Sequence, residues 1–232
     1  MEAQYWRQKW DEGKIGFHQA EVNKRLVTFW PNVTAEPVYH QNGEKACIFV
    51  PLCGKSLDML WLHEQGHSVL GIDLSAKAVQ AFFDDNQLSC QRDEIDGFQR
   101  FKGLGSAEGI TLLAGDFFNL TSSMVSNCVA VYDRAALIAM PPDMRGDYAS
   151  HLAMLMRPGS RGLLLAISYD QSRMQGPPFS VTDDNLRSLL SSDFSLRELA
   201  HYGGPERVGN LAERGLETLD ERVYLLTRKP QN

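Results

Sequence analysis

The regular alternation of short apolar segments with amphipathic segments is the feature that most constrains the fold of this chain. Residues 47–51 read Cys-Ile-Phe-Val-Pro, a continuous apolar run that is typical of a strand buried on both faces of a parallel sheet. Apolar residues at helical spacing predict a helix over 56–65, and a second strand over 68–73 follows almost at once. Strands that alternate with helices in this way predict a doubly wound α/β sheet.

The same pattern continues to the end of the chain. Helices are predicted over 76–86, 143–156 and 182–191, and strands over 110–114, 129–132, 162–167, 195–200 and 222–227, with a candidate short strand near 98–101. The last two strands are expected to form a hairpin through the turn Gly203-Gly204-Pro205. We expect a single domain over 1–232, in which 46–232 form the sheet core, 1–30 form an added N-terminal helical segment and 91–109 form a polar addition.

Composition and charge narrow the class of protein. The chain has 232 residues and a formal net charge of −6, which disfavours nucleic acid and acidic membrane surfaces as partners. No stretch approaches the roughly 20 apolar residues that cross a bilayer, and the start lacks the apolar centre of a signal peptide, so a cytoplasmic protein is expected. The four cysteines contain no CxxC pair, which favours reduced, mostly buried thiols over a disulfide framework.

Ligands of such sheets bind beyond the carboxyl ends of the strands, so the residues directly after each strand are the candidate site. These residues are Leu52-Cys53-Gly54-Lys55-Ser56, Asp73, Asp116-Phe117 and Asp133-Arg134. An acidic residue 19 positions after Gly54, at the end of the second strand, is placed to accept hydrogen bonds from the two hydroxyls of a ribose. Taken alone, Asp73 could equally cap a helix. Together with the glycine turn, it favours a nucleoside site.

Two nucleotide motifs are incomplete at this turn. Gly54-Lys55-Ser56 resembles the end of a phosphate-binding loop, but Phe49 stands where that loop needs its first glycine. A dinucleotide fingerprint needs three glycines after the first strand, and only Gly54 is present. The sequence therefore predicts a ligand that has a ribose and no diphosphate.

A third motif, His63-Glu64-Gln65-Gly66-His67, matches the HExxH pattern of zinc hydrolases. That chemistry needs both histidines one turn apart on a continuing helix. Here Gly66 is expected to end the helix, and the next strand begins at Ser68. Zinc hydrolysis through His63 and His67 therefore stays a disfavoured alternative, and no metal site is predicted.

Several blocks of the chain resemble one known family. They are Tyr5-Trp6-Arg7-Gln8-Lys9-Trp10, Gly16-Phe17-His18-Gln19, the run from Phe49 to Met59 with its Pro-Leu-Cys-Gly-Lys-Ser core, Asp133-Arg134-Ala135-Ala136-Leu137-Ile138-Ala139, and the closing Glu213-Arg214 and Glu221 to Thr227. These blocks strongly resemble the thiopurine S-methyltransferases, particularly the bacterial branch. The resemblance implies a class I methyltransferase (Rossmann-like) fold, with a mostly parallel seven-stranded sheet, an antiparallel last strand and an N-terminal helical lid. It implies S-adenosylmethionine as methyl donor and S-adenosylhomocysteine as product.

The resemblance also implies roles for individual residues. It assigns the cofactor to Trp6, Trp10, Leu52, Gly54, Asp73, Asp116, Phe117 and Arg134, with Asp73 on the ribose, Asp116 and Phe117 on the adenine and Arg134 at the methyl-donor end. The family usually has Glu where Asp73 stands, and Asp reaches about one methylene less far, which leaves the ribose contact open. The segment 41–45 looks longer than in shorter bacterial members and is expected to be a surface loop.

The methyl acceptor must be a soft atom that ionises near neutral pH, because a thiolate attacks better than a thiol. By the family pattern, Arg134 and Arg214 are the catalytic residues that stabilise this anion, and they bind substrate together with Phe17 and His18. We expect Trp6, Trp10 and Phe17 to form the lid, and the loop 169–179 to form another wall of the acceptor pocket. The alternatives are that the aromatic residues are ordinary core and that the arginines form surface ion pairs.

The predicted function is methyl transfer to thiopurines or other aromatic and heterocyclic thiols, with selenium and tellurium compounds as further acceptors in detoxification. The alternative from another class is a noncatalytic regulator that binds S-adenosylmethionine or a nucleoside. A monomer with a small-molecule thiol as partner is expected. The physiological acceptor and any general base stay open.

Overall fold

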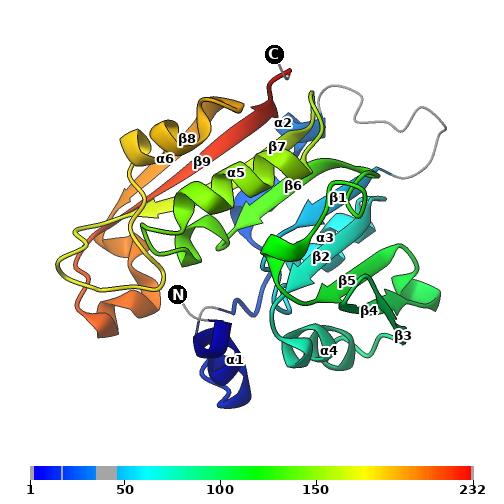
Figure 1. Cartoon of the computed structure of the whole chain (residues 1–232). Helices are drawn as coiled ribbons and strands as arrows, with labels where there is room; N and C mark the ends of the chain where they lie inside the picture. The colour runs from blue at the N-terminus through cyan, green and yellow to red at the C-terminus, as the bar shows by residue number, and fades with distance from the viewer. Residues whose placement is uncertain (1–2, 17, 35–45, 231–232) are drawn as a thin grey trace.

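The part of the chain that the structure describes contains one twisted sheet of nine strands, in the order β3-β4-β5-β2-β1-β6-β7-β9-β8 (Figure 1). The structure is a computed structural model and describes residues 3–16, 18–34 and 46–230. Its centre is five parallel strands, which in spatial order are β5 (Ile110–Ala114), β2 (Ser68–Asp73), β1 (Cys47–Val50), β6 (Cys128–Arg134) and β7 (Arg161–Ser168). The antiparallel β9 (Leu219–Arg228) lies between β7 and β8 (Phe194–Gly204).

The predicted doubly wound sheet with an antiparallel last strand is therefore confirmed. The seven expected strands run from β5 to β8, and an antiparallel hairpin of β3 (Cys90–Ile95) and β4 (Phe98–Gly103) extends the sheet beyond them. The hairpin turns at Asp96 and Gly97, which have φ of 50° and 83°. An Asp-Gly pair with positive φ at both positions is the preferred two-residue turn between antiparallel strands. The candidate short strand near 98–101 is thus confirmed as β4, and the rest of the polar addition over 91–109 contributes most of β3 as well.

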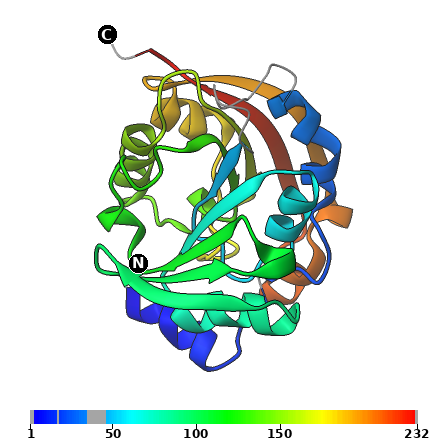
Figure 2. The same cartoon turned by 90° about the vertical axis from the view of Figure 1, so that its right-hand side faces the viewer.

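Helices cover both faces of the sheet (Figure 2). One face carries α2 (Lys24–Thr34), α3 (Asp58–Glu64) and α4 (Ala76–Asp85), and the other carries α5 (Arg145–Leu155) and α6 (Asp183–Leu190). Side chains alternate between these two layers along each strand. Phe49 and Val131 pack toward α5 and α6, whereas Ile48 and Tyr132 pack toward α2 and α3. Both faces of the central strands are buried, which explains why residues 47–50 are apolar without interruption.

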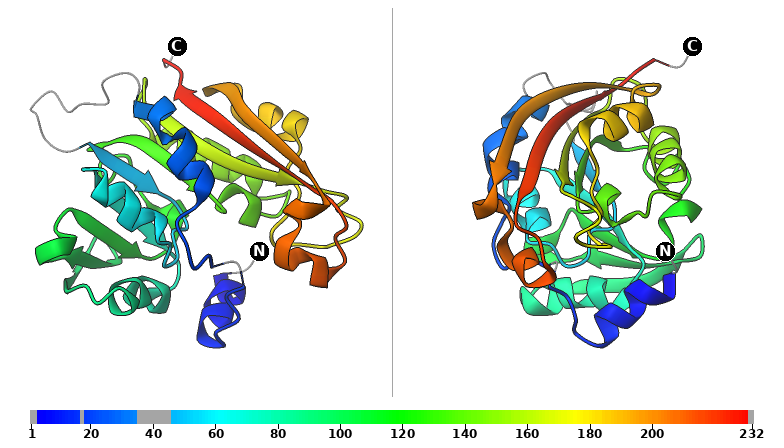
Figure 3. Two further views of the ribbon diagram at one scale, coloured as in Figure 1. Left: turned by 180° about the vertical axis from the view of Figure 1, so that it is seen from behind. Right: turned by 90° about the vertical axis from the view of Figure 1, so that its left-hand side faces the viewer.

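The N-terminal segment divides into two helices with different surroundings. Leu26, Trp30 and Val33 of α2 are buried in the core beside β7 and β9, so α2 belongs to the layer that covers the sheet. Figure 3 shows α2 across the sheet and α1 (Ala3–Asp11) apart from it, below the strands. The expected lid over 1–30 is therefore too long, because the residues from Lys24 onward are part of the core.

The connection between β8 and β9 is longer than the predicted turn at 203–205. It contains two short 3₁₀ helices, η4 (Pro205–Arg207) and η5 (Gly209–Arg214). Val208, Leu216 and Leu219 pack with Met174 from the segment after β7, which gives this end of the molecule its own small apolar cluster. In the described residues, no helix has the length and apolar character needed to cross a membrane.

Candidate active site

A cavity of about 980 Å³ lies at the carboxyl ends of β1, β2, β5 and β6. This volume is at the upper end of what small-molecule and cofactor sites enclose, and it is large enough for a nucleoside-sized ligand together with a second small molecule. Its walls come from α1, the turns after the four strands, the segment after β7 and the connection between β8 and β9. Of the predicted site residues, the lining includes Trp6, Trp10, His18, Leu52, Gly54, Asp73, Asp116, Phe117, Arg134 and Arg214.

The turn after β1 is shaped by main-chain conformation. Leu52 and Gly54 have φ of 48° and 52°, a region that favours glycine. A Cβ at Gly54 would lie 3.0 Å from Cζ2 of the buried Trp10, so the main chain and the indole approach closely. A larger residue at position 54 would push the indole away and distort the turn.

Asp73 ends β2 and is 9% exposed. Its Oδ2 accepts a hydrogen bond from the backbone N–H of Gly54, and its Oδ1 accepts one from the backbone N–H of Ser75, both at 2.9 Å. Burial raises the pKa of Asp73 to about 6, against the lowering effect of those two hydrogen bonds. Each carboxylate oxygen keeps a further lone pair, so the group can accept two more donors from a ligand.

Asp116 and Phe117 follow β5. The Asp116 side chain is exposed and accepts a hydrogen bond from the backbone N–H of Phe118 at 3.0 Å, which caps η2 (Phe117–Asn119). The Phe117 ring is buried and stacks on Tyr148, with 5.0 Å between ring centroids. A flat apolar surface beside a carboxylate therefore lines this part of the cavity.

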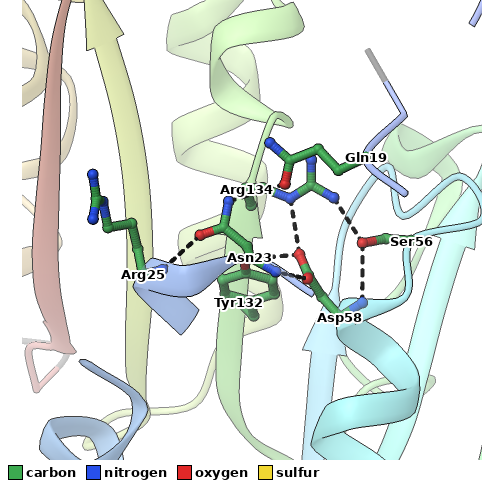
Figure 4. A network of polar contacts seen from close by, with 7 residues as sticks. All are labelled: Gln19, Asn23, Arg25, Ser56, Asp58, Tyr132 and Arg134. Carbon is green, nitrogen blue, oxygen red and sulfur yellow. Dashed lines mark hydrogen bonds and ion pairs between the residues drawn. The ribbon is translucent and has the colours of Figure 1, made fainter. Parts of the chain in front are cut away.

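Arg134 ends β6 and is held by a buried carboxylate (Figure 4). Its Nε donates to Oδ2 of Asp58 at 2.9 Å, and its Nη2 donates to Oγ of Ser56 at 2.7 Å. Asp58 is 1% exposed, whereas the Arg134 side chain is 14% exposed. Asp58 and Ser56 therefore fix the Nε and Nη2 side of the guanidinium, and its remaining N–H donors line the cavity.

Two further donors complete the Asp58 carboxylate. The hydroxyl of Tyr132 donates to Oδ2 at 2.9 Å, and the backbone N–H of Asn23 donates to Oδ1 at 2.7 Å. Asp58 thus joins the N-terminal segment, α3 and β6 at one point. A buried charge with this number of donors is stable, and removing it would leave Arg134 without its fixed position.

Arg214 lines the same cavity from the connection between β8 and β9. It lies at the end of η5, is exposed, and its Nη1 donates to the carbonyl oxygen of Pro177 at 2.6 Å. This bond ties the β8–β9 connection to the segment after β7, so the predicted wall over 169–179 does reach the cavity through Pro177 and Pro178. The structure thus brings the two predicted arginines to one cavity.

His18 lines the same region and is half-buried. Burial lowers the pKa of His18, and the charges of Lys55 and Arg134 lower it further. These effects favour the neutral form of the imidazole. Phe17, the other predicted substrate residue of this segment, and the loop 41–45 lie outside the described residues.

The HExxH match does not form the helical pair that zinc binding requires, as the expected end of the helix at Gly66 indicated. Helix α3 ends at Glu64, so His63 and His67 do not lie one turn apart on a helix. The ring nitrogens of His63 lie 3.2 and 3.1 Å from the carbonyl oxygens of His67 and Ser106, and Nε2 of His67 accepts a hydrogen bond from the indole of Trp30. Both side chains thus have protein partners, and the geometry that the zinc interpretation requires is missing.

Comparison with known proteins identifies the family. The sequence model described as "Thiopurine S-methyltransferase (TPMT)" matches residues 1–229. The chain belongs to the thiopurine S-methyltransferase family. A thiopurine S-methyltransferase of Pseudomonas fluorescens is 45% identical over 97% of this chain and 98% of its own length, and one of Azotobacter vinelandii is 44% identical over 99% and 100%.

Solved structures agree on the fold. A methyltransferase from Anabaena variabilis that depends on S-adenosylmethionine covers 98% of this chain and 95% of its own, with a TM-score of 0.64 and 14% identity. The magnesium protoporphyrin IX methyltransferase of Synechocystis, solved with S-adenosylhomocysteine bound, covers 98% of this chain and 100% of its own, also with a TM-score of 0.64, at 16% identity. The chain is therefore a methyltransferase of class I fold that uses S-adenosylmethionine.

Three residues of the site, Asp58, Asn23 and Tyr132, are not among the site residues that the sequence predicts. Asp58 lies in the run from Phe49 to Met59, which carries the family resemblance. A charged residue at position 58, on the face of a helix that otherwise turns Met59 and Leu62 into the core, is the signal that would have found it. A carboxylate in that place requires partners.

Proposed function

We propose that the enzyme transfers the methyl group of S-adenosylmethionine to the sulfur of thiopurines or other aromatic and heterocyclic thiols. The observation that carries the proposal is the placement of Arg134. A guanidinium fixed on the buried Asp58 borders the same cavity as Asp73, so a cation stands ready for an anionic acceptor beside a nucleoside-sized site. The thiopurine S-methyltransferases at about 45% identity support the choice of a thiol acceptor.

The residues at the β1–β2 end fit the cofactor. The free lone pairs of Asp73 would accept the two ribose hydroxyls, and the Phe117 ring with Asp116 would border the adenine. Leu52, Gly54 and Trp10, which line the same cavity, would border the rest of the molecule. Trp6 on α1 would close over it from outside.

Methyl transfer to sulfur is an in-line displacement, so alignment is the main task of the protein. When bound, S-adenosylmethionine supplies a methyl group that its positively charged sulfur already activates. Arg134 and Arg214 would hold the acceptor as thiolate, because a guanidinium stabilises the anion without giving up a proton itself. The thiol proton leaves to solvent before the transfer. Alignment together with exclusion of water supplies roughly 7 to 11 kcal/mol in favourable cases.

Selenium and tellurium compounds belong to the same proposal, because a reduced selenium or tellurium centre is a soft nucleophile like a thiolate. They place no further demand on the site than a cavity with cationic walls. Whether these compounds are accepted depends on the width of the acceptor pocket. That width is set in part by the two segments that the hydrogen bond from Arg214 to Pro177 joins.

Product analysis by mass spectrometry tests the proposal. Chelator-treated enzyme is incubated with S-adenosylmethionine and, separately, 6-mercaptopurine, a simple aryl thiol and selenide. We expect a methylated thiol and an equal amount of S-adenosylhomocysteine. Cofactor binding without methylation of any acceptor would contradict the thiol assignment and favour a nucleoside-binding regulator. Activity only without chelator would contradict transfer by this arrangement of side chains.

A further inference from the structure

Two cysteines face one another at the amino ends of the central strands β1 and β6, whereas the cavity lies at the carboxyl ends. Cys47 is the first residue of β1, and Cys128 is the first residue of the neighbouring β6. The two residues are partners at the start of this parallel pair, where the register shifts by one residue between Cys47 and Ile48, and their Sγ atoms lie 2.9 Å apart. At the other ends of the same two strands, Leu52 follows β1 and Arg134 is the last residue of β6, and both line the cavity.

From this geometry we propose that Cys47 and Cys128 are a modification site, a dithiol that peroxide oxidises reversibly to a disulfide between β1 and β6. Neighbouring strands run about 4.7–4.9 Å apart, which lies inside the Cα separation of 4.4–6.8 Å that disulfides span. The sulfurs already point at each other, so the bond needs only a small further approach of side chains. The strands themselves need not move.

The two thiols differ in chemical role. The hydrogen bond from Cys128 lowers the pKa of Cys47, and the same bond raises the pKa of Cys128, as does burial. Cys47 is half-buried, whereas Cys128 is 2% exposed. The more exposed sulfur is therefore also the better nucleophile, and the buried sulfur stands behind it as the resolving thiol.

The reaction balances in two steps. The Cys47 thiolate attacks one oxygen of hydrogen peroxide, which breaks the O–O bond, gives a sulfenic acid on Cys47 and releases hydroxide. The Cys128 sulfur then attacks the Cys47 sulfur, the S–O bond breaks, and the hydroxyl leaves as water with the proton of the Cys128 thiol. Each sulfur loses one electron, and the peroxide takes up both.

The other two cysteines provide internal controls. Cys53, in the turn after β1, is 5% exposed, and burial together with the charge of Asp73 raises the pKa of its thiol. Cys90 starts β3 and lies at the far edge of the sheet, so the spacing of the strands separates it from the pair. Oxidation is thereby directed away from the cofactor turn.

Thiol mapping of the native enzyme tests the proposal. Reduced protein is treated with a modest excess of hydrogen peroxide, denatured, alkylated and digested. We expect the mass to fall by two hydrogens, two of the four cysteines to resist alkylation, a crosslinked Cys47–Cys128 peptide, and full reversal by dithiothreitol. Four alkylated cysteines, a crosslink to Cys53 or Cys90, or sulfinic acid on Cys47 without a crosslink would each overturn it.

Single variants separate the two roles. Cys128→Ser is expected to accumulate a sulfenic acid on Cys47 that dimedone traps, whereas Cys47→Ser is expected to leave Cys128 unmodified at the same dose. The reverse pattern would contradict the assignment of Cys47 as nucleophile. Circular dichroism verifies that each variant is folded, and the wild-type mapping decides the main point without any substitution.

Discussion

The two ends of the cavity are built in different ways. At the β1–β2 end, Gly54 and Asp73 are buried and their mutual contact uses a main-chain N–H, so the strands and their turns fix the geometry. At the other end, Arg134 and Arg214 contribute long side chains, and Arg214 comes from an exposed connection between strands. Side chains on connections change more readily than main chain in a buried turn. The first end suits one constant ligand, and the second can vary with the acceptor.

Replacement of Asp73 should have the largest effect. Asp73→Ala removes two acceptors for the ribose, and hydrogen bonds to charged groups contribute about 1.5–3 kcal/mol each, so affinity for S-adenosylhomocysteine should fall by about 100-fold or more. Isothermal titration calorimetry measures this. An unchanged affinity for S-adenosylhomocysteine would show that Asp73 does not bind the ribose. The β1–β2 end of the cavity would then not be the cofactor end.

Asp58→Asn tests whether the buried carboxylate fixes Arg134 at the acceptor end of the cavity. The variant leaves Arg134 near an uncharged amide, so kcat/KM for the thiol should fall by about 30- to 100-fold while affinity for S-adenosylhomocysteine changes by only a few-fold. The free energy of unfolding should fall by about 2–4 kcal/mol, because one partner of a buried ion pair is lost. Urea denaturation and steady-state kinetics report both.

Asp93→Asn is the matched control, since Asp93 pairs with Arg100 on the exposed β3–β4 hairpin. It should leave stability and turnover nearly unchanged. If Asp58→Asn retained normal thiol kinetics at normal cofactor affinity, Arg134 would not depend on this carboxylate for its function.

Arg214→Ala should act on the acceptor alone. Loss of one exposed guanidinium is expected to raise KM for an anionic thiol by about tenfold, with the affinity for S-adenosylhomocysteine within twofold of wild type. Arg173→Ala is the control, because Arg173 is exposed, pairs with Glu217 and does not line the cavity. An equal loss of cofactor affinity in Arg214→Ala would show that the ends are not independent.

The sequence predicted the first end well because the required information is local. The predicted bounds of β2 and β5 coincide with the structure, and the turn at Gly54 followed by Asp73 already indicated a ribose. Continuous apolar strands and a glycine between them leave few alternatives for such a segment.

Two features were not predicted from the sequence: the role of Asp58, which depends on partners far away in the chain, and strand β3, which is largely exposed to solvent. Asp58 contacts Asn23 and Tyr132, which are 35 and 74 positions away, and no spacing rule connects them. Strand β3 is mostly polar because one of its edges and much of its surface face solvent, so its composition resembled a loop. The local signals for that hairpin were the Asp96-Gly97 turn and the candidate strand near 98–101.

The pH dependence of binding and of stability should separate Asp73 from the rest of the core. Burial raises the pKa of Asp73 and of Asp133 to about 6 each, and Asp133 does not line the cavity. Only ionised Asp73 accepts both ribose hydroxyls, so affinity for S-adenosylhomocysteine should fall by about tenfold from pH 7 to pH 5. Asp73→Asn should abolish this dependence.

Stability should change in the opposite direction. A carboxyl group with a raised pKa holds its proton more tightly in the folded than in the unfolded chain, so its contribution is present below pH 4 and is lost as pH rises through about 6. The contribution of these two groups to the free energy of unfolding thus falls where affinity rises. Parallel curves for binding and stability would show that the binding curve reports unfolding instead.

His18→Ala should have the smallest effect, although His18 lies at the acceptor end beside Arg134. Burial and the neighbouring charges of Lys55 and Arg134 lower the pKa of its imidazole, which favours the neutral form, but an acidic thiol ionises without a base. We expect kcat to fall by less than about threefold and KM for the thiol to rise modestly, because only a lining side chain of the pocket is lost.

His201→Ala is the control, because His201 is exposed and pairs with Asp220. A loss of more than about a thousandfold in kcat with normal cofactor affinity would instead make His18 a proton acceptor. The acceptor end would then supply chemistry as well as position, and its freedom to vary would be much smaller than the exposed connections suggest.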